Sequence, residues 1–108
     1  MVWSVRFLNL AVQREVEALP DDMQARLIRV IDLIGSFGLT ALREPQVKHL
    51  TGKLWEIRLS GRSGIGRVIY AAAVGQRVVL LRAFIKKTQG TPKREIQIAF
   101  ERLKEIGD

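Results

Sequence analysis

The side chains best suited to chemistry are the cations of one segment, residues 77–92. Its first half is a nearly continuous apolar run with β-branched residues on both parities, which is typical of a strand covered on both faces. Arg82 interrupts this run, and a buried guanidinium is costly unless it pairs with a carboxylate or reaches solvent. Lys86 and Lys87 then stand at the end of the strand, before Thr-Gln-Gly breaks it. The three cations predict a platform for an anion.

The positive charge of the chain is concentrated in its second half. The formal net charge is +7. Residues 1–46 hold five Lys/Arg and six Asp/Glu, a balance of −1, whereas residues 47–108 hold thirteen and five, a balance of +8. This asymmetry favours a polyanion such as nucleic acid as the partner, and a basic surface without a ligand is the alternative. Charge alone does not separate RNA from DNA, or binding from cleavage.

The composition argues against most metal and cofactor chemistry. The chain has no cysteine and one histidine, His49, so we expect neither a disulfide framework nor a structural zinc site. The basic half has no cluster of carboxylates that would hold Mg²⁺. Gly61, Gly64 and Gly66 match neither a dinucleotide-binding nor a phosphate-loop spacing, and no helix is predicted after them. We therefore expect no metal and no other cofactor.

Two helices are predicted in the N-terminal half. Residues 2–7 alternate as a short strand with one buried face. Asn9 can cap a helix that ends at Pro20, and Asp21 and Asp22 open a second helix that stops near Gly35. Because the turn between them is very short, the helices should form an antiparallel hairpin over one face of a sheet.

The basic half predicts three strands and a final helix. Residues 36–46 indicate a loop, and residues 47–53 are a dense basic segment. A strand over residues 54–59 should face inward with Trp55, Ile57 and Leu59. A glycine-rich hairpin loop over residues 60–66, a return strand over 67–74 and the strand from residue 77 would complete an antiparallel meander. Thr91 at the N-cap and Pro92 at the first helical position begin the C-terminal helix.

These elements predict a single small α+β domain over residues 1–108. It would contain an N-terminal strand and helical hairpin, an antiparallel sheet of about four strands and a C-terminal helix. Within the sheet, Glu56 could neutralise Arg82 as an internal ion pair, and Tyr70 would belong to the core. No apolar run approaches the roughly 20 residues of a membrane helix, and residues 1–7 lack signal-peptide features, so we expect a cytoplasmic protein without membrane contact.

Three stretches give the chain a more specific resemblance. They are residues 47–58, residues 66–70, and residues 80–92 with their ordered phrase Phe-Ile-Lys-Lys-Thr-Gln-Gly-Thr-Pro. The chain resembles the RelE/ParE superfamily of toxins from bacterial type II toxin–antitoxin systems, and these stretches resemble its phage-derived, HigB-type branch. The resemblance covers most of the chain and is tightest from residue 47 onward.

The resemblance implies an endoribonuclease that cleaves messenger RNA on the ribosome, without a metal, and so inhibits translation. It also implies a cognate antitoxin, often encoded nearby and carrying a helix-turn-helix domain, that neutralises the toxin in a hetero-oligomer. Metal-free cleavage uses the neighbouring 2′-hydroxyl as the nucleophile. Such a reaction needs a base, an acid for the leaving oxygen and cations around the phosphate.

The same resemblance implies roles for the cations of the basic half. Arg67 would stabilise phosphate charge, and Lys86 and Lys87 would serve the leaving group or the transition state. The further candidates are Arg82 and His49 as catalytic residues, and Lys48, Lys53, Arg58 and Arg62 as RNA-binding residues. Many relatives carry histidine near Arg82, and a permanently charged guanidinium is a poor base. Histidine ordinarily titrates near neutral pH, so His49 is one candidate, and the identity of the base stays open.

Two other classes of function fit the same sequence. A ParE-type protein shares the fold and inhibits DNA gyrase by binding, for which it needs no nuclease residues. A nucleic-acid-binding module without catalytic activity is the second alternative, because Arg82 replaces a group that could titrate. Cleavage of RNA separates the nuclease from both, and inhibition of gyrase separates the two alternatives from each other.

Overall fold

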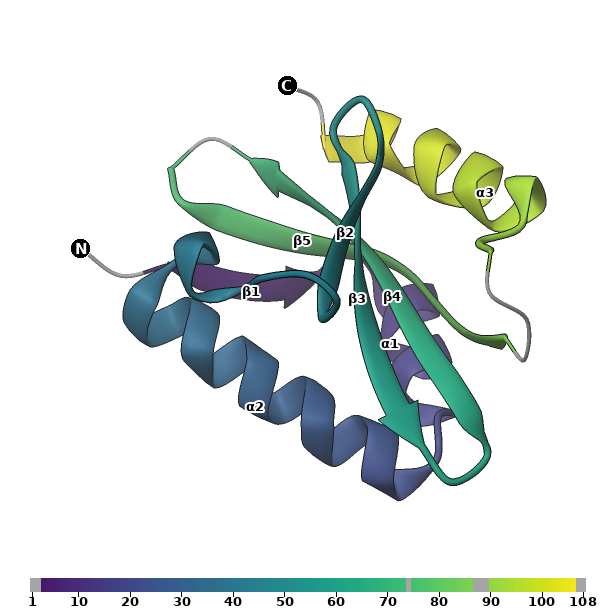
Figure 1. The fold of residues 1–108 in the computed structure, drawn as a ribbon. Helices are drawn as coiled ribbons and strands as arrows, with labels where there is room; N and C mark the ends of the chain where they lie inside the picture. The colour runs from purple at the N-terminus through teal and green to yellow at the C-terminus, as the bar shows by residue number, and fades with distance from the viewer. Residues whose placement is uncertain (1–2, 74, 87–89, 107–108) are drawn as a thin grey trace.

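One mixed sheet organises the chain. The structure, a computed structural model, describes residues 3–73, 75–86 and 90–106. The strands lie in the order β1-β5-β4-β3-β2 (Figure 1), with β1 parallel to β5 and every other neighbouring pair antiparallel. Their bounds are Ser4–Phe7 for β1, Val47–Thr51 for β2, Leu54–Gly61 for β3, Gly64–Ala73 for β4 and Arg77–Lys86 for β5. The prediction of an α+β domain is confirmed.

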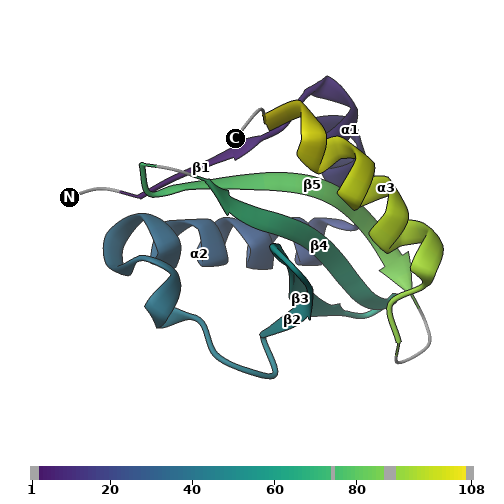
Figure 2. The same cartoon turned by 90° about the horizontal axis from the view of Figure 1, so that it is seen from above.

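Helices pack on both faces of the sheet. α2 (Asp21–Phe37) lies under one face, whereas α3 (Lys93–Leu103) lies over the other (Figure 2). α1 (Leu10–Glu17) packs against β5 beside the short strand β1. Two 3₁₀ helices, η1 (Leu39–Ala41) and η2 (Lys104–Ile106), follow α2 and α3. Among the described residues, no helix has the length and apolar character needed to cross a membrane.

Each face of the sheet has its own apolar core. On the α2 side, Val12 and Val16 of α1 join the buried stripe of α2 and the strand residues Ile57, Val68 and Leu80. On the α3 side, the buried residues are Leu54, Ile69, Ala71, Val79, Leu81 and Ala99. The continuous apolar run of β5 therefore does serve both faces, as predicted.

Tyr70 belongs to the core on the α2 side and is 3% exposed. Its burial raises the pKa of the phenol to about 12. The hydroxyl is thus protonated at physiological pH, which agrees with the prediction that Tyr70 is a core residue.

The sheet has one strand more than expected, and it is mixed. The basic segment at residues 47–53, for which no strand is predicted from the sequence, forms β2 and the turn into β3. Its side chains are mostly exposed, because β2 is an edge strand, so the segment carries no apolar alternation. The N-terminal strand pairs at the opposite edge, where it runs parallel to β5.

The hairpin loop predicted over residues 60–66 from its glycines is shorter in the structure. Gly61 and Gly64 pair with each other, so only Arg62 and Ser63 form the turn. Gly66 lies within β4, where a Cβ atom would stand 2.7 Å from the sulfur of Met23. This glycine permits the close approach of α2 to the sheet rather than a turn.

Two helix boundaries and the burial of one side chain differ from the prediction. α2 continues two residues beyond Gly35, to Phe37. α3 begins at Lys93, with Pro92 as its N-cap, while the hydroxyl of Thr91 bonds to a side chain of β3 instead of capping the helix. Trp55 faces the same side of the sheet as Ile57 and Leu59, as predicted, but it is 38% exposed, and its ring meets that of His49 edge-on.

Candidate functional site

Cross-strand register brings three of the predicted cations to one face of the sheet. Arg58 of β3 lies opposite Arg67 of β4, which in turn lies opposite Phe84 of β5. Opposite residues share a face, and Phe84 packs against the core on the α3 side. Lys86 pairs with Ile65, two positions from this row along both strands. It therefore lies diagonal to Arg67, roughly 7–8 Å away. We call Arg58, Arg67 and Lys86 the basic face.

Glu56 and Arg67 form a buried ion pair beneath this face. The distance from Nη1 of Arg67 to Oε1 of Glu56 is 2.8 Å, and the two side chains are 1% and 0% exposed. The hydroxyl of Thr91 donates a hydrogen bond to the other carboxylate oxygen of Glu56. The carboxylate is thus shared between β4 and the segment that enters α3. Because it is fully engaged, Glu56 ties the start of α3 to the basic face.

Arg58 adds a second positive charge without a second carboxylate. Its backbone N–H donates to the carbonyl oxygen of Gln46 at 2.8 Å, pointing away from β4. Arg58 and Arg67 are therefore a non-hydrogen-bonded pair, the type in which side chains approach most closely. Nε of Arg58 is buried and has no hydrogen-bond partner. Neither Arg58 nor Lys86 pairs with a carboxylate in the described part of the chain.

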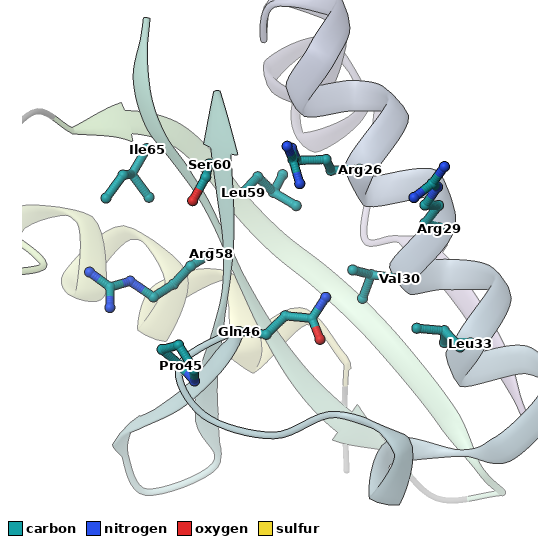
Figure 3. Close-up of a pocket in the computed structure, with 10 residues that line it drawn as sticks. All are labelled: Arg26, Arg29, Val30, Leu33, Pro45, Gln46, Arg58, Leu59, Ser60 and Ile65. Atoms are coloured by element: carbon teal, nitrogen blue, oxygen red, sulfur yellow. The ribbon is translucent and has the colours of Figure 1, made fainter. Parts of the chain in front are cut away.

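A pocket of about 630 Å³ extends from Arg58 to α2 (Figure 3). Arg26 and Arg29 of α2 lie on one side of it, and Arg58 leaves β3 on the side away from α2. The remaining lining residues are Val30, Leu33, Pro45, Gln46, Leu59, Ser60 and Ile65. Three arginines and no carboxylate line this space. The sequence reasoning missed Arg26 and Arg29 because they belong to the half of the chain whose charges nearly cancel.

Arg82 is neutralised, but by other partners than Glu56. Its Nη1 lies 2.7 Å from Oε2 of Glu15, and its Nε lies 2.6 Å from Oε1 of Glu95. The expectation that Glu56 could pair with Arg82 was wrong, because Glu56 is held by Arg67. The ion pairs instead join β5 to α1 and α3.

The same cluster covers a strand edge. β1 ends at Phe7, so the later part of β5 has a strand, β4, on one side only. There Glu15 accepts a hydrogen bond from the backbone N–H of Ala83, and Arg102 donates one to the carbonyl oxygen of Leu81. Arg102 also donates to both carboxylate oxygens of Glu15. These side chains satisfy backbone groups that a neighbouring strand would otherwise pair with.

These contacts keep both Glu15 and Arg82 charged. Burial alone would raise the pKa of Glu15, but the hydrogen bonds from Arg102 and from the Ala83 N–H, together with the charge of Arg82, lower it below the ordinary 4.5. Burial likewise opposes the charged form of Arg82, yet Glu95 and Glu15 raise its pKa above the ordinary value. Arg82 is thus a permanent cation with two anionic partners.

The structure separates His49 from the basic face. Lys48 lies opposite Glu56 and is exposed, so it stands on the α3 side at the rim of the basic face. His49, the next residue, points to the other side, where it lies opposite Trp55 with 4.9 Å between ring centroids. Its Nε2 is 2.8 Å from the carbonyl oxygen of Gly52. Register thus places His49 across the sheet from Arg67.

The remaining predicted cations are dispersed. Arg62 is exposed at the β3–β4 turn, where its backbone N–H donates to Oδ2 of Asp22. Lys53 is exposed at the β2–β3 turn and lines an apolar pocket with Phe100 and other residues near the C-terminus. Lys87 lies outside the described residues.

The basic face is suited to a phosphate rather than to a metal ion. Its two unpaired cations, Arg58 and Lys86, would attract a phosphodiester and repel a divalent cation. The nearest carboxylate, Glu56, already holds Arg67 and Thr91. Within the described part of the chain, no three His, Cys, Asp or Glu side chains come together as metal ligands.

This chain is similar to a described family, to two named proteins and to one solved structure. The profile of the family described as "Phage derived protein Gp49-like" matches residues 14–104. Two proteins named "Probable endoribonuclease HigB1", from two strains of Mycobacterium tuberculosis, are 33% identical over 94 residues, which is 85% of this chain and 70% of theirs. The crystal structure of the archaeal RelE–RelB complex from Pyrococcus horikoshii OT3 contains a chain with a TM-score of 0.59 and 24% identity. That match covers 82% of this chain and 100% of the other, and it shows a shared fold.

Proposed function

Since the chain belongs to the phage-derived, Gp49-like family, we propose that it is the toxin of a type II toxin–antitoxin system and acts as an endoribonuclease. Its relatives from Mycobacterium tuberculosis carry the name of probable endoribonucleases. Within this chain, one observation carries the proposal: Arg58 and Arg67 lie opposite each other on neighbouring strands, Lys86 lies diagonal to Arg67, and one carboxylate, Glu56, accompanies the three cations. This excess of positive charge favours a phosphodiester as ligand.

We propose that the reaction uses the 2′-hydroxyl of the RNA itself. Its oxygen forms a bond to the adjacent phosphorus while the bond from phosphorus to the 5′-oxygen breaks. The proton of the 2′-hydroxyl passes to solvent water, and the protein delivers a proton to the 5′-oxygen. The products are a 2′,3′-cyclic phosphate and a 5′-hydroxyl. The protein need only position the strand, stabilise the added negative charge and supply the proton.

Each cation of the basic face then has a part. The guanidinium of Arg58, which forms no ion pair among the described residues, binds a non-bridging oxygen of the scissile phosphate. Lys86 donates the proton to the leaving oxygen or stabilises its charge, assisted by Lys87, which follows it in the chain. Arg67 is buried, so it acts by fixing Glu56 and by adding positive potential beneath the phosphate. His49 and Arg82 take no part, because one faces away and the other is neutralised.

The RNA and its partners extend beyond these residues. We propose that Lys48, exposed at the rim of the basic face, and Arg62, exposed at the β3–β4 turn, bind phosphates flanking the cleavage site, and that Lys53 contacts RNA farther away. The substrate in this proposal is messenger RNA on the ribosome, whose decoding site holds the strand in the reactive geometry. The cations make the reaction independent of a metal.

An antitoxin completes the proposed system. The RelE structure that shares this fold is of a RelE–RelB complex, and we propose that this chain is likewise held in a hetero-oligomer by a protein encoded nearby, with a helix-turn-helix domain. Both proteins would act in the cytoplasm, where the translated message is.

Expression under tight repression tests the proposed activity. The wild-type chain, an Arg58→Gln/Lys86→Gln variant and an Arg14→Gln/Arg94→Gln control are induced, and 5′ ends in messenger RNA are mapped by primer extension. The control removes two exposed cations that lie outside the basic face. We expect new cuts within translated messages for the wild type and the control, and none for the first variant. Growth arrest with intact messenger RNA would instead support inhibition of gyrase.

A further inference from the structure

β3 extends beyond the first residue of β2, so the outer edge of its last residues has no strand partner. β2 begins at Val47, opposite Ile57, and the last backbone bond across this edge runs from Arg58 to Gln46. Ladder hydrogen bonds alternate in direction along an antiparallel strand. The N–H and C=O of Ser60 therefore point outward, like those of Arg58, and no strand lies beside them in the described part of the chain. Such an edge is a template for another extended segment.

The pocket of Figure 3 lies along this edge and carries only positive charge. Arg26 and Arg29 line it from α2, and Arg58 lines it from β3. None of these three arginines has an ion-pair partner among the described residues. Leu33 of α2, which is 37% exposed, supplies apolar surface beside the arginines. A complementary ligand would thus present carboxylates around an apolar side chain.

Apolar surface continues along α2 beyond the pocket. Leu33 and Phe37 are 37% and 68% exposed, and they line an adjoining pocket of about 290 Å³ with Arg29. Leu33 and Arg29 belong to both pockets. Exposed large apolar side chains that adjoin one another on a helix mark a surface that binds another protein. The strip from β3 to Phe37 is therefore one continuous surface.

We propose that an extended, acidic segment of the antitoxin docks on this surface as an added strand at the edge of β3. Its backbone pairs with the N–H and C=O of Ser60, its carboxylates bind Arg26, Arg29 and Arg58, and an apolar side chain packs on Leu33. The proposal rests on the proposed toxin function. A peptide fits better than RNA because the edge offers backbone hydrogen bonds and the adjoining α2 surface is apolar.

This mode of docking explains how the antitoxin would block RNA cleavage. Arg58 lines the pocket and also belongs to the basic face. A carboxylate bound to Arg58 would remove the guanidinium from the phosphate, and the added strand would fill the space beside β3. The antitoxin would thus compete with RNA through a shared residue, without covering Lys86.

The test uses the complete chain and, as probe, the protein encoded beside its gene. The two are co-expressed and purified, and their dissociation constant is measured for the wild type and two charge-reversal variants. Arg26→Glu/Arg29→Glu reverses two charges in the pocket, and Arg14→Glu/Arg94→Glu makes the same change in net charge elsewhere. We expect at least roughly tenfold weaker binding for the first variant and wild-type binding for the second.

Ser60→Pro tests the added strand separately from charge. Proline removes an outward N–H that the β3–β4 ladder does not use, and such edge positions tolerate proline. We expect weaker binding of the probe while circular dichroism stays that of the folded chain. Hydrogen exchange of the wild-type complex gives a second readout that needs no substitution, because the Ser60 amide should become protected on binding.

Three outcomes would overturn the proposal. Wild-type affinity of Arg26→Glu/Arg29→Glu would show that the segment docks elsewhere. Wild-type affinity combined with loss of messenger RNA cleavage would make the pocket part of the RNA surface. Failure of the wild-type chain to bind the probe would also end the docking proposal, whereas cleavage by the same preparation would leave the endoribonuclease function standing.

Discussion

Arg67 and Glu56 form an ion pair that is almost entirely removed from solvent, with 2.8 Å between Nη1 and Oε1. Taking either charge out of water is expensive, and the attraction between them offsets this cost only while both are present. Arg67 is therefore a poor target for a simple test of catalysis, because its loss leaves the Glu56 carboxylate buried and unpaired. Effects on folding and on activity must be measured separately at this position.

The ion pair predicts strong non-additivity in stability. Arg67→Met should lower the free energy of unfolding by about 3–5 kcal/mol, since it leaves a buried carboxylate without its partner. Glu56→Gln/Arg67→Met removes both charges and should lose much less than the sum of the two single variants. Urea denaturation of the four proteins measures the coupling. Additive losses would mean that the pair is not the coupled unit seen in the structure.

Lys86 should matter for the chemical step and little for folding. It is partly exposed at the end of β5 and has no carboxylate partner among the described residues. Loss of a positioned acid typically costs about 10²–10⁴-fold in rate. We expect Lys86→Gln to lower single-turnover cleavage of ribosome-bound messenger RNA in this range, with an unchanged urea midpoint. Wild-type cleavage would remove Lys86 from the mechanism.

His49 provides the opposite prediction. Because it faces away from Arg67 and packs against Trp55, His49→Ala should leave the cleavage rate within about threefold of wild type, far from the loss expected for a removed base. The pH dependence of cleavage near neutrality should also be unchanged. A large fall in rate with normal stability would reinstate His49 as the base.

Glu15 predicts a specific response to acid. Its folded pKa is lowered below 4.5, so the stability that it contributes is fully present above that pH and is lost as the pH falls through the folded pKa. Glu15→Gln should be less stable at pH 7 by about 1–2 kcal/mol. Below about pH 4.5 its stability should fall less steeply than that of the wild type, as measured by thermal unfolding. Parallel curves would contradict the ion-pair cluster around Arg82.

Local patterns predicted most of the elements. Alternation in residues 54–59 placed Ile57 and Leu59 correctly in the core. It failed at Trp55, which lies opposite His49 on the edge strand and is not covered by α2. Edge strands are weakly specified by apolar alternation, and this is also why β2 was missed.

The site needed information that no local pattern contains. The cations of the basic face could be listed from the sequence, but their separation from His49 depends on the register of β2 with β3. Likewise, the partners of Arg82 proved to be Glu15 of α1, far away in the sequence, and Glu95 of α3, rather than Glu56 of β3. Long-range packing decides which charges meet, and a single sequence does not reveal it.

The nature of the RNA ends formed by the purified chain tests the central claim most directly. Ribosomes stalled on a defined message are incubated with the wild type or with Arg58→Gln/Lys86→Gln, and the new 5′ ends are labelled with polynucleotide kinase without prior phosphatase treatment. We predict that wild-type ends accept the label at once, because they carry hydroxyl groups, and that the variant produces almost none. New ends that carry 5′-phosphate, or equal cleavage by the variant, would contradict cleavage by the cations of the basic face.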